Sequence, residues 1–536
     1  MKNLILILIV YNAILFRVYS QANEDWVVRF DGPGHGQDIG RAIIVDNSGN
    51  VYVTGNSQGA SPDFVTIKYN SSGIEQWNQR YGVGGLDLPN AIAVDNAGNV
   101  YVTGQLANGG TQYDCVTIKY NSAGVQQWAK IYNGVGSGDD VAKAMAVDVS
   151  GNVYITGYTF INSSDYDYIT IKYNSSGDSV WVKRYNGPAD IDYGTNLKVD
   201  ASGNVYVTGY SLGVNSNFDF TTVKYNSSGA EQWVKRYNGS GNLSDYPVCI
   251  SLDNSGNVYV AGFSTGSGSG FDYVVIKYGP SGDSLWAQRY NGPANLDDNP
   301  EWMEVDPAGN VYITGYSEGT GTGIDYATIK YNTNGILQWV TRYNGPGNGE
   351  DHGTALKVDT GGNTYVTGYS NSSTGFDYAT IKYNPAGVQQ WITRYNWTTN
   401  ASDQAFALIL DNSGNIYVTG GSTGTFSYDL TTIKYSQPLG IQPVSGEIPE
   451  KYSISQNYPN PFNPNTIIKF QIANLSEAKL IVYNVLGEQV AVLVNEQLRP
   501  GTYEVNWNAS NLPSGVYFYT LNAGDFIETK KMILTK

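Results

Sequence analysis

One phrase of ten residues recurs through most of this chain and sets the spacing of everything before residue 440. It reads Asp-Ala-Ser-Gly-Asn-Val-Tyr-Val-Thr-Gly at residues 200–209, and its central Asn returns once in every copy. The eight copies place this residue at Asn50, Asn99, Asn152, Asn204, Asn257, Asn310, Asn363 and Asn415. A nearly constant period of this length predicts a propeller, a solenoid or an array of small units.

Each period contains four β-rich runs, which we label A to D. The A run is apolar, as at residues 91–94, and the B run is the Val-Tyr-Val-Thr of the repeated phrase. The C and D runs are exemplified by residues 167–173 and 181–185, with Gly, Asn and Ser clusters between the runs. This pattern predicts four-stranded antiparallel units and few helices.

The two ends of the repeated region indicate a closed ring. In seven repeats the last Tyr of the C run is followed eight residues later by a Trp, as in Tyr69 and Trp77, but no Trp follows Tyr435 in the eighth. A spare D-like run, Trp26–Phe30, precedes the first A run. We expect it to complete the last unit and close an all-β, eight-bladed β-propeller, a ring that leaves only short protected strand edges. An open solenoid would not need this permutation.

The N-terminus has the composition of a secretory signal. An apolar-dominated run from Leu4 to Phe16 follows Lys2, and small residues stand near Ser20 and Ala22. The run is short for a membrane span, so residues 1–22 are interpreted as a signal peptide cut within residues 20–22, with an uncleaved anchor as the alternative. No transmembrane segment is expected in the mature protein.

The net charge argues against one class of partner, and the positions of the cysteines argue against a disulfide bond. Lys plus Arg number 31 against 47 Asp plus Glu, a formal net charge of −16. Such a surface repels phosphate backbones and argues against a nucleic-acid partner. Cys115 and Cys249 fall three blades apart, so both are expected to be buried free thiols.

Two kinds of loop should lie on opposite faces of the propeller. The A–B and C–D turns repeat Asp-x-x-Gly-Asn and Tyr-Asn-x-x-Gly, which is the chemistry of tight turns. The B–C and D–A loops vary in sequence, and varied loops on a rigid scaffold are where ligand sites usually lie. The candidate ligand-binding residues on this face are Asp140, Asp192, Asp298, Tyr158, Tyr210 and Tyr316.

Two further sets of Asp residues recur at the edge of this varied face. One set stands eight residues before the Asp of each A–B turn, at Asp38, Asp87, Asp140, Asp192, Asp245, Asp298, Asp351 and Asp403. The other opens each C run, at Asp63, Asp114, Asp167, Asp219, Asp272, Asp325, Asp377 and Asp429. Eightfold repetition favours a structural role, capping loop amides or tying blades together. The alternatives are the attraction of cationic groups and Ca²⁺ bound by Asp139, Asp140, Asp297 and Asp298, since calcium prefers oxygen ligands. No other cofactor is expected.

Catalytic motifs are sparse. The two histidines, His35 and His352, both fall in D–A loops and are expected to face solvent. No Gly-x-Ser-x-Gly nucleophile elbow stands between a strand and a helix. Paired carboxylates such as Asp139 and Asp140 could serve a glycosidase, but one member of each pair belongs to the repeated Asp set. No catalytic residue is predicted.

The repeat resembles a known family. Asp-x-Ser-Gly-Asn-Val-Tyr-Val-Thr-Gly followed by Asp-Tyr-x-Thr-Ile-Lys-Tyr-Asn is similar to the SBBP β-propeller repeats of secreted bacterial proteins, over about residues 26–435. That family name implies seven blades, whereas this chain contains eight repeats. The Gly-x-x-x-Trp ending at residues 229–233 resembles the tryptophan-docking motif of eight-bladed quinoprotein dehydrogenases, which implies that each Trp packs between blades. The adjacent-cysteine pair of many such enzymes is missing, so the resemblance implies geometry and not redox chemistry.

The C-terminal region departs from the repeat. We assign residues 23–435 to the propeller, 436–451 to a Pro- and Gly-containing linker and 452–536 to a second domain of short alternating strands, predicted to be a small immunoglobulin-like β-sandwich. Its motifs, from Tyr458-Pro-Asn-Pro-Phe-Asn-Pro to Lys530-Lys-Met-Ile-Leu-Thr-Lys, closely resemble the type A sorting domain of the type IX secretion system of Bacteroidota. The resemblance implies recognition by that secretion machinery and removal of the domain after export. An ordinary immunoglobulin-like binding module is the alternative.

Together these observations predict a secreted or cell-surface propeller that binds a glycan or a surface protein through its varied loop face. Tyr-rich loops suit stacking on sugar rings. The alternatives are an extracellular polysaccharide hydrolase or lyase on the same face, and a structural adhesin or spacer.

Overall fold

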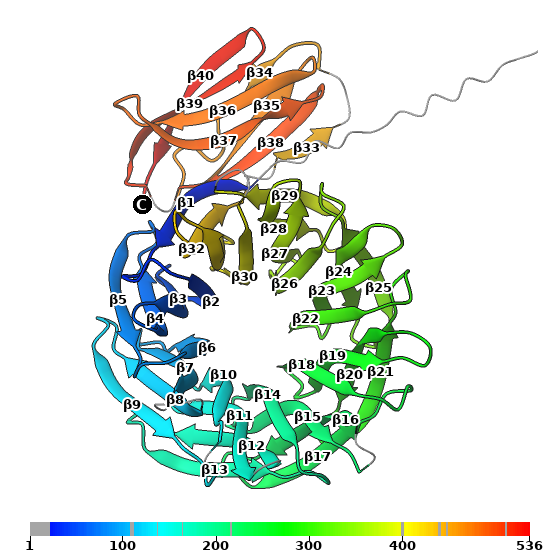
Figure 1. The fold of residues 1–536 in the computed structure, drawn as a ribbon. Helices are drawn as coiled ribbons and strands as arrows, with labels where there is room; N and C mark the ends of the chain where they lie inside the picture. Colours follow the sequence, from blue (N-terminus) through cyan, green and yellow to red (C-terminus); the bar gives the residue numbers. More distant parts are fainter. Residues whose placement is uncertain are drawn as a thin grey trace, which may run out of the picture. The chain divides into compact units, whose positions relative to one another are not determined.

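A computed structural model describes residues 22–536 apart from 108–111, 137, 163–164, 215–216, 398–400, 438–440, 446–448 and 510–511. The predicted signal peptide, except for Ala22, therefore lies outside the described residues. The chain divides into a unit of residues 23–436 and a second unit that contains residues 437–536. The two units are visible in Figure 1.

The first unit consists of eight four-stranded antiparallel sheets, counted over the described residues. The A strands are β2 (Asp38–Val45), β6 (Leu88–Val94), β10 (Val141–Val147), β14 (Asp192–Val199), β18 (Asp245–Leu252), β22 (Asp298–Val305), β26 (Asp351–Val358) and β30 (Asp403–Leu410). The B strands are β3 (Val51–Gln58), β7 (Val100–Ala107), β11 (Val153–Asn162), β15 (Val205–Leu212), β19 (Val258–Thr265), β23 (Val311–Gly319), β27 (Thr364–Ser372) and β31 (Ile416–Thr423). The C strands are β4 (Pro62–Tyr69), β8 (Tyr113–Tyr120), β12 (Asp165–Tyr173), β16 (Phe218–Tyr225), β20 (Phe271–Tyr278), β24 (Gly323–Tyr331), β28 (Gly375–Tyr383) and β32 (Tyr428–Ser436). The D strands are β5 (Glu75–Tyr81), β9 (Gln126–Tyr132), β13 (Ser179–Tyr185), β17 (Glu231–Tyr237), β21 (Ser284–Tyr290), β25 (Leu337–Tyr343), β29 (Gln389–Tyr395) and, in the eighth sheet, β1 (Asn23–Phe30).

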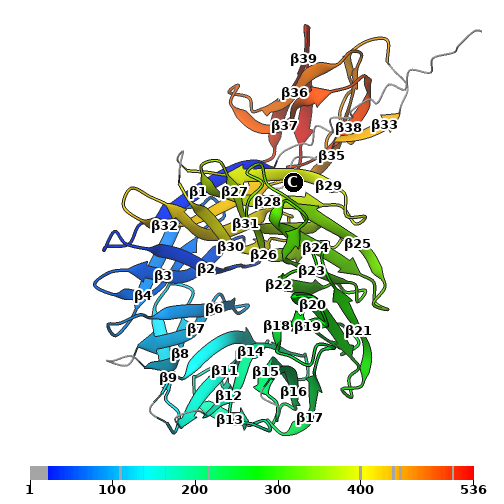
Figure 2. The same ribbon diagram turned by 45° about the vertical axis from the view of Figure 1, so that its right-hand side comes forward.

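These sheets are the blades of a β-propeller, as the repeat predicts. The A strands surround a central opening in both ribbon views, and the D strands form the rim of the ring (Figures 1 and 2). No helix occurs among the described residues. The described part of the chain likewise contains no helix that could cross a membrane.

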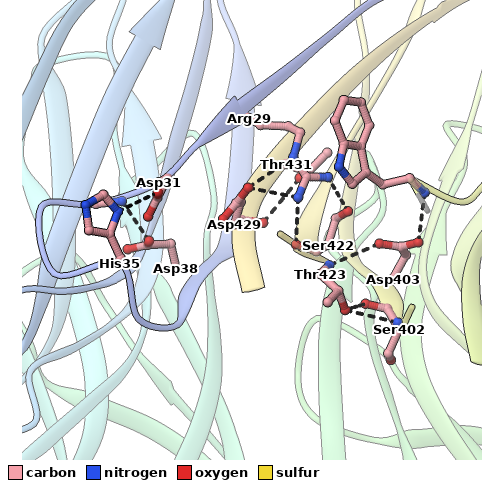
Figure 3. Close-up of polar contacts among 12 residues, drawn as sticks. Arg29, Asp31, His35, Asp38, Ser402, Asp403, Ser422, Thr423, Asp429 and Thr431 are labelled. Carbon is pink, nitrogen blue, oxygen red and sulfur yellow. Dashed lines mark hydrogen bonds and ion pairs between the residues drawn. The ribbon is translucent and has the colours of Figure 1, made fainter. Parts of the chain in front are cut away.

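The N-terminal strand closes the ring, which confirms the prediction for Trp26–Phe30. Strand β1 pairs antiparallel with β32, with Trp26 opposite Lys434 and Phe30 opposite Leu430. The Arg29 guanidinium donates to Asp429 Oδ2 at 2.9 and 3.1 Å and to Ser422, as Figure 3 shows. Residues some 400 positions apart are thereby joined in one blade.

Neighbouring blades are joined by the repeated Trp. The Trp77 indole nitrogen donates to the Ser122 carbonyl in the next C–D turn at 3.1 Å, and its ring lies 6.2 Å from Tyr52 and from Tyr120. Trp26 makes the corresponding bond to Ser71 O at 3.2 Å, so the closing strand docks on blade one in the same way. A Cβ on Gly124 would lie 2.7 Å from the Trp77 ring, which explains why each turn ends in Gly.

The repeated phrase itself folds into the A–B turn. In blade four, Asp200 Oδ1 accepts the Ser202 and Asn204 backbone amides at 2.9 Å, and Oδ2 accepts the Asn204 side chain at 2.7 Å and the Tyr206 hydroxyl at 3.1 Å. Gly203 has a φ of 76°, a conformation that other residues rarely adopt. The same network recurs around Asp46, Asp95, Asp148, Asp253, Asp306, Asp359 and Asp411. Each copy of the phrase therefore encodes one turn.

Each blade packs an apolar layer against its neighbour. The cluster between blades five and six contains Cys249, Tyr259, Tyr273, Ile313 and Ile329, all buried. Cys115 is buried in the corresponding layer between blades two and three, and both thiols are free. The cysteines are thus core residues, as expected from their distance along the ring.

The second unit is a β-sandwich. One sheet has the order β33-β38-β35-β34 and the other β37-β36-β39-β40. Their bounds are β33 (Ile441–Ser445), β34 (Ser453–Ile454), β35 (Asn465–Ile472), β36 (Ser476–Tyr483), β37 (Gln489–Leu498), β38 (Gly501–Asn508), β39 (Gly515–Ala523) and β40 (Phe526–Leu534). Both sheets contribute to one core, which includes Phe470, Leu480, Trp507 and Tyr519.

The interpretation of residues 436–451 as a linker is wrong for part of that segment. Residues 441–445 form β33, which pairs with β38 at the edge of its sheet. Pro443 argued against a strand there, but an edge strand tolerates a residue that lacks a backbone N–H.

Candidate functional site

The Asp set that precedes each A–B turn is buried, and this corrects the expectation that it edges an open face. Asp140, Asp192 and Asp298 are at most 1 % exposed. Asp140 accepts the Gly134 amide at 2.6 Å and the Thr159 hydroxyl, and Asp192 accepts the Gly187 amide at 2.6 Å. The carboxylates fasten the D–A loops, because those loop amides have no strand partner. They do not reach a ligand at the surface.

Burial governs the electrostatics of this set, which we call the loop aspartates. Desolvation raises the pKa of all eight carboxyls: Asp38, Asp87, Asp140, Asp192, Asp245, Asp298, Asp351 and Asp403. For Asp192 the pKa rises to about 6. A buried carboxylate is unfavourable unless it is fully hydrogen-bonded or protonated.

The Asp at the start of each C strand is also structural. In seven blades it pairs with an Arg of the D strand, as in Arg236 Nη2 with Asp219 Oδ2 at 2.8 Å. The other pairs are Arg29 with Asp429, Arg80 with Asp63, Arg184 with Asp167, Arg289 with Asp272, Arg342 with Asp325 and Arg394 with Asp377. In blade two Ile131 occupies the Arg position. These pairs tie the C strand to the D strand in seven of the eight blades.

The calcium candidates are held by backbone amides. Asp139 Oδ1 accepts the Tyr113 amide at 3.0 Å, and Asp297 Oδ1 accepts the Phe271 amide at 2.9 Å. Each joins a D–A loop to the first C-strand residue of the preceding blade. Asp140 and Asp298 are the buried loop aspartates beside them. Within the described ranges no three His, Cys, Asp or Glu side chains are grouped to hold a metal ion.

The prediction for the two histidines is right for one and wrong for the other. His35 is solvent-facing and bonds Asp31 at 2.7 Å, as Figure 3 shows. His352 lies in strand β26, with a side chain only 15 % exposed, because its ring is stacked 4.8 Å from Tyr369 and lies 4.6 Å from Tyr316. Burial lowers the pKa of His352.

A continuous run of aromatic rings lies at the loop face, the face of the propeller that carries the B–C and D–A loops. We call it the first aromatic arc. It consists of Tyr158, Phe160, Tyr166, Tyr193, Tyr210, Phe218, Tyr246, Phe263 and Phe271, on blades three to five. Tyr193 is central, with its ring 4.6 Å from Tyr158, 5.3 Å from Tyr166 and 5.2 Å from Tyr210. Tyr210 continues the run to Tyr246 at 5.1 Å. Every one of these rings is half-buried, so the arc combines fixed positions with accessible surface.

A second aromatic arc occupies blades six to eight. It consists of Tyr316, His352, Tyr369, Phe376 and Phe406. Tyr316 contacts His352 and His352 contacts Tyr369, whose ring also contacts Phe376 and Phe406. Glu301 is close enough that its charge raises the pKa of Tyr369, after burial, to about 12. The Glu301 side chain is exposed, yet desolvation by the surrounding protein raises its pKa to about 7.

Blades one and two break the pattern. Where blade four has Tyr193 and Tyr210, blade one has Ile39 and Asn56 and blade two has Leu88 and Gln105. The loop-face mouth of the propeller is therefore asymmetric, unlike the eightfold turn face. Asymmetry is expected of a ligand site, since a repeated scaffold needs none for stability.

Sequence reasoning found part of this surface. Tyr158 and Tyr210 belong to the first arc and Tyr316 to the second, so the structure places all three candidate tyrosines at the mouth. Tyr193 and Tyr246 were missed, although each directly follows a loop aspartate where blades one to three have Ile39, Leu88 and Val141. That change of residue type at a repeated position is the signal that could have found them.

Comparison with known proteins agrees with this architecture. The family model described as a beta-propeller repeat matches residues 32–61, 76–105, 127–163 and 180–219, and the model described as a secretion system C-terminal sorting domain matches residues 456–535. The chain therefore contains four segments that match β-propeller repeats and a C-terminal segment that matches a type IX secretion sorting domain. The sorting domain directs this repeat protein to the cell surface or the extracellular space.

Individual relatives of the repeat protein are distant. An uncharacterized WD repeat-containing protein of Acanthamoeba polyphaga mimivirus is 25% identical, over 42% of this chain and 24% of its own length, so the match spans about a quarter of that relative. Among solved structures, PorZ of the type IX secretion system of Porphyromonas gingivalis is 12% identical with a TM-score of 0.32, covering 94% of this chain and 74% of PorZ. The polysaccharide lyase Uly1 is 12% identical with a TM-score of 0.41, covering 78% of this chain and 98% of the lyase.

Proposed function

We propose that this exported propeller binds carbohydrate at its loop-face mouth and releases it unchanged. The observation that carries the proposal is the first aromatic arc, in which nine half-buried rings from three blades form one surface. Aromatic rings held in fixed positions offer apolar faces to sugar rings, and Tyr hydroxyls offer hydrogen bonds at the same place. Neighbouring rings hold Tyr193 and Tyr246 in place, so ligand binding would cost little ordering entropy.

The buried loop aspartates support the arc from beneath. Asp192 begins the same strand as Tyr193, and Asp245 begins the same strand as Tyr246. By fastening the D–A loop, each fixes the start of the strand on which the ring stands. The candidate aspartates thus act as positioning residues for the site rather than as ligands.

Binding of the full-length chain to an immobilised glycan panel, with soluble reducing ends measured in parallel, tests the proposal. We expect saturable binding without new reducing ends, and a loss of about 3- to 10-fold in affinity for Tyr193→Ala, the range of one aromatic contact. Phe426→Ala is the matched control, because Phe426 is a 75 % exposed ring on the same loop face outside both arcs.

The remaining outcomes overturn the proposal in distinguishable ways. Release of reducing ends would indicate a polysaccharide hydrolase or lyase. Binding to a surface protein but to no glycan would indicate a protein ligand. Binding to neither would favour a structural spacer. Repeating the binding assay with a chelator tests Asp139, Asp140, Asp297 and Asp298 as calcium ligands. We expect no change, since a backbone amide already donates to one oxygen of each carboxylate.

A further inference from the structure

The central channel is a cationic cavity in an acidic protein. A cavity of about 400 Å³ is lined by A-strand residues of all eight blades. Four of the lining side chains are cationic, Arg41, Lys143, Lys198 and Lys357, and within the described residues none of the lining side chains is a carboxylate. The chain as a whole carries a formal charge of −16. The charge that lines the central cavity is therefore opposite in sign to the net charge of the chain.

Three of these four cations lack a carboxylate partner. Lys357 Nζ lies 3.3 Å from Glu304 Oε1, which neutralises it. Arg41 Nε donates to the neutral Asn56 Oδ1 at 2.9 Å, and Lys143 Nζ lies 5.7 Å from the centre of the Tyr158 ring. In the described part of the chain no ion pair engages Arg41, Lys143 or Lys198.

The protein around Arg41, Lys143 and Lys198 disfavours their charged forms when no anion is bound. The three side chains are open to the water of the channel, yet protein surrounds them closely enough that desolvation lowers the pKa of each. The charge of Arg41 further lowers the pKa of Lys143. A bound anion would relieve both the desolvation and the repulsion, since charges attract more strongly where water is restricted.

The acidic residues of the inner strands do not cancel the charges of Arg41 and Lys143, although the charge of Glu304 acts on Lys198 as well as on Lys357. Glu304 is engaged by Lys357 and by the Val358 amide at 3.1 Å. Glu301 occupies the β22 position equivalent to Arg41 in β2 and Lys143 in β10, on the far side of the ring from both. The positive charge thus gathers toward blades one and three, where the aromatic arc begins.

We propose that Arg41 and Lys143 together bind an anionic group of the carbohydrate ligand, a carboxylate or a sulfate ester, at the mouth of the channel. This inference rests on the proposed carbohydrate site and specifies its ligand as an acidic glycan. Lys143 connects the two features, because its ammonium lies over Tyr158 of the first arc. A guanidinium can hold either oxyanion through two hydrogen bonds, and the ammonium adds a point charge.

Binding of the full-length chain to matched polymers at constant ionic strength tests the inference. Polygalacturonate and its carboxyl-reduced form isolate the carboxylate, and dextran sulfate and dextran isolate the sulfate. We expect the charged member of at least one pair to bind more tightly. Arg41→Gln and Lys143→Gln should each weaken that preference roughly tenfold, as for one charge-assisted hydrogen bond. Lys451→Gln, which removes one exposed charge in the second unit, should leave it unchanged.

The outcomes separate this inference from the proposed function. Equal affinity for charged and neutral members would overturn the anionic site while leaving the carbohydrate site standing. Failure to bind any polymer would overturn both. A preference that Arg41→Gln and Lys143→Gln leave intact would place the anion elsewhere, and Lys143→Arg, which keeps the charge, should retain the preference if the site is as proposed.

Discussion

Two aspartates at opposite ends of one strand show how position decides what the same residue does. Asp245 begins β18 at the loop face and is fully buried, whereas Asp253 directly follows β18 at the turn face. Asp245 accepts the Gly239 amide at 2.6 Å, and burial raises its pKa. Burial would also raise the pKa of Asp253, but hydrogen bonds from Asn257, Tyr259 and Ser255 outweigh it and lower that pKa. Hydrogen bonds stabilise the turn carboxylate as an anion, whereas burial disfavours the charged form of the loop carboxylate.

The largest expected consequence of this difference is a pH-dependent stability, because all eight loop aspartates act together. A carboxyl with a folded pKa above its unfolded value of about 3.9 favours folding below that value, and this contribution is lost as pH rises through the folded pKa. For Asp192 the folded pKa is about 6. We therefore expect the free energy of unfolding to fall between pH 4.5 and 7. The turn aspartates with lowered pKa lose their contribution only at more acidic pH.

Denaturant titrations of the full chain at several pH values would measure this slope. Asp192→Asn should flatten it by removing one titrating group. The lowered pKa of His352 acts in the opposite direction below its ordinary value of 6.5, but it is a single group. A stability that rises steadily from pH 4.5 to 7 would contradict the electrostatics described for the loop aspartates.

Removing a turn aspartate should give the next largest effect. Asp253→Ala removes the acceptor of the Ser255 and Asn257 amides and leaves the Tyr259 hydroxyl only the Gly309 carbonyl, at 3.4 Å. Hydrogen bonds to a charged group contribute about 1.5–3 kcal/mol each, and the exposed amides can bind water instead, so we expect a loss of about 3 kcal/mol in the free energy of unfolding. Urea denaturation measures it; a loss below about 1 kcal/mol would show that the turn does not depend on this carboxylate.

Asparagine substitutions compare the two aspartates directly, and we expect their effects on the free energy of unfolding to differ by about 1 kcal/mol. Asp245→Asn keeps one acceptor oxygen for Gly239 and removes a desolvated charge, so its cost should be small. Asp253→Asn instead places an amide among donors and should cost more at pH 7. Comparing the unfolding free energies of the two variants tests whether the loop aspartates and the turn aspartates differ as described. Equal costs would mean that they do not.

The fold could be predicted from the sequence because each repeat encodes its own turn. Asp200, Gly203 and Asn204 make contacts within a few residues of one another, so their pattern indicates the local structure directly. Even the closing strand was predictable, since Trp26 repeats the position of Trp77. The contacts that decide the site are not local. The burial of Asp192 depends on a folded D–A loop, and an Asp in a loop is ordinarily exposed.

The mouth illustrates the same limit. Tyr158 and Tyr210 were found as candidates because varied loops carry them, but the arc exists only because Tyr193 of the next A strand lies between them. Arg41 and Lys143 stand within runs interpreted simply as apolar inner strands. Their common cavity arises from ring closure, which brings A strands from all eight blades around one axis.

The smallest expected effect comes from extending the aromatic arc by one ring. Gln105 occupies the blade-two position equivalent to Tyr158, is half-buried and stands opposite Leu88. Gln105→Tyr should change the free energy of unfolding by no more than about 0.5 kcal/mol, as for a partly exposed substitution outside the core. If the arc is a sugar-binding surface, the added ring should raise affinity for the best glycan by about two- to threefold, within the range of one aromatic contact. Asn96→Tyr in the A–B turn of the same blade adds the same ring to the turn face and is the control. A gain for the turn-face variant, or a loss for Gln105→Tyr in a stably folded protein, would contradict the assignment of the sugar-binding surface to the aromatic arc.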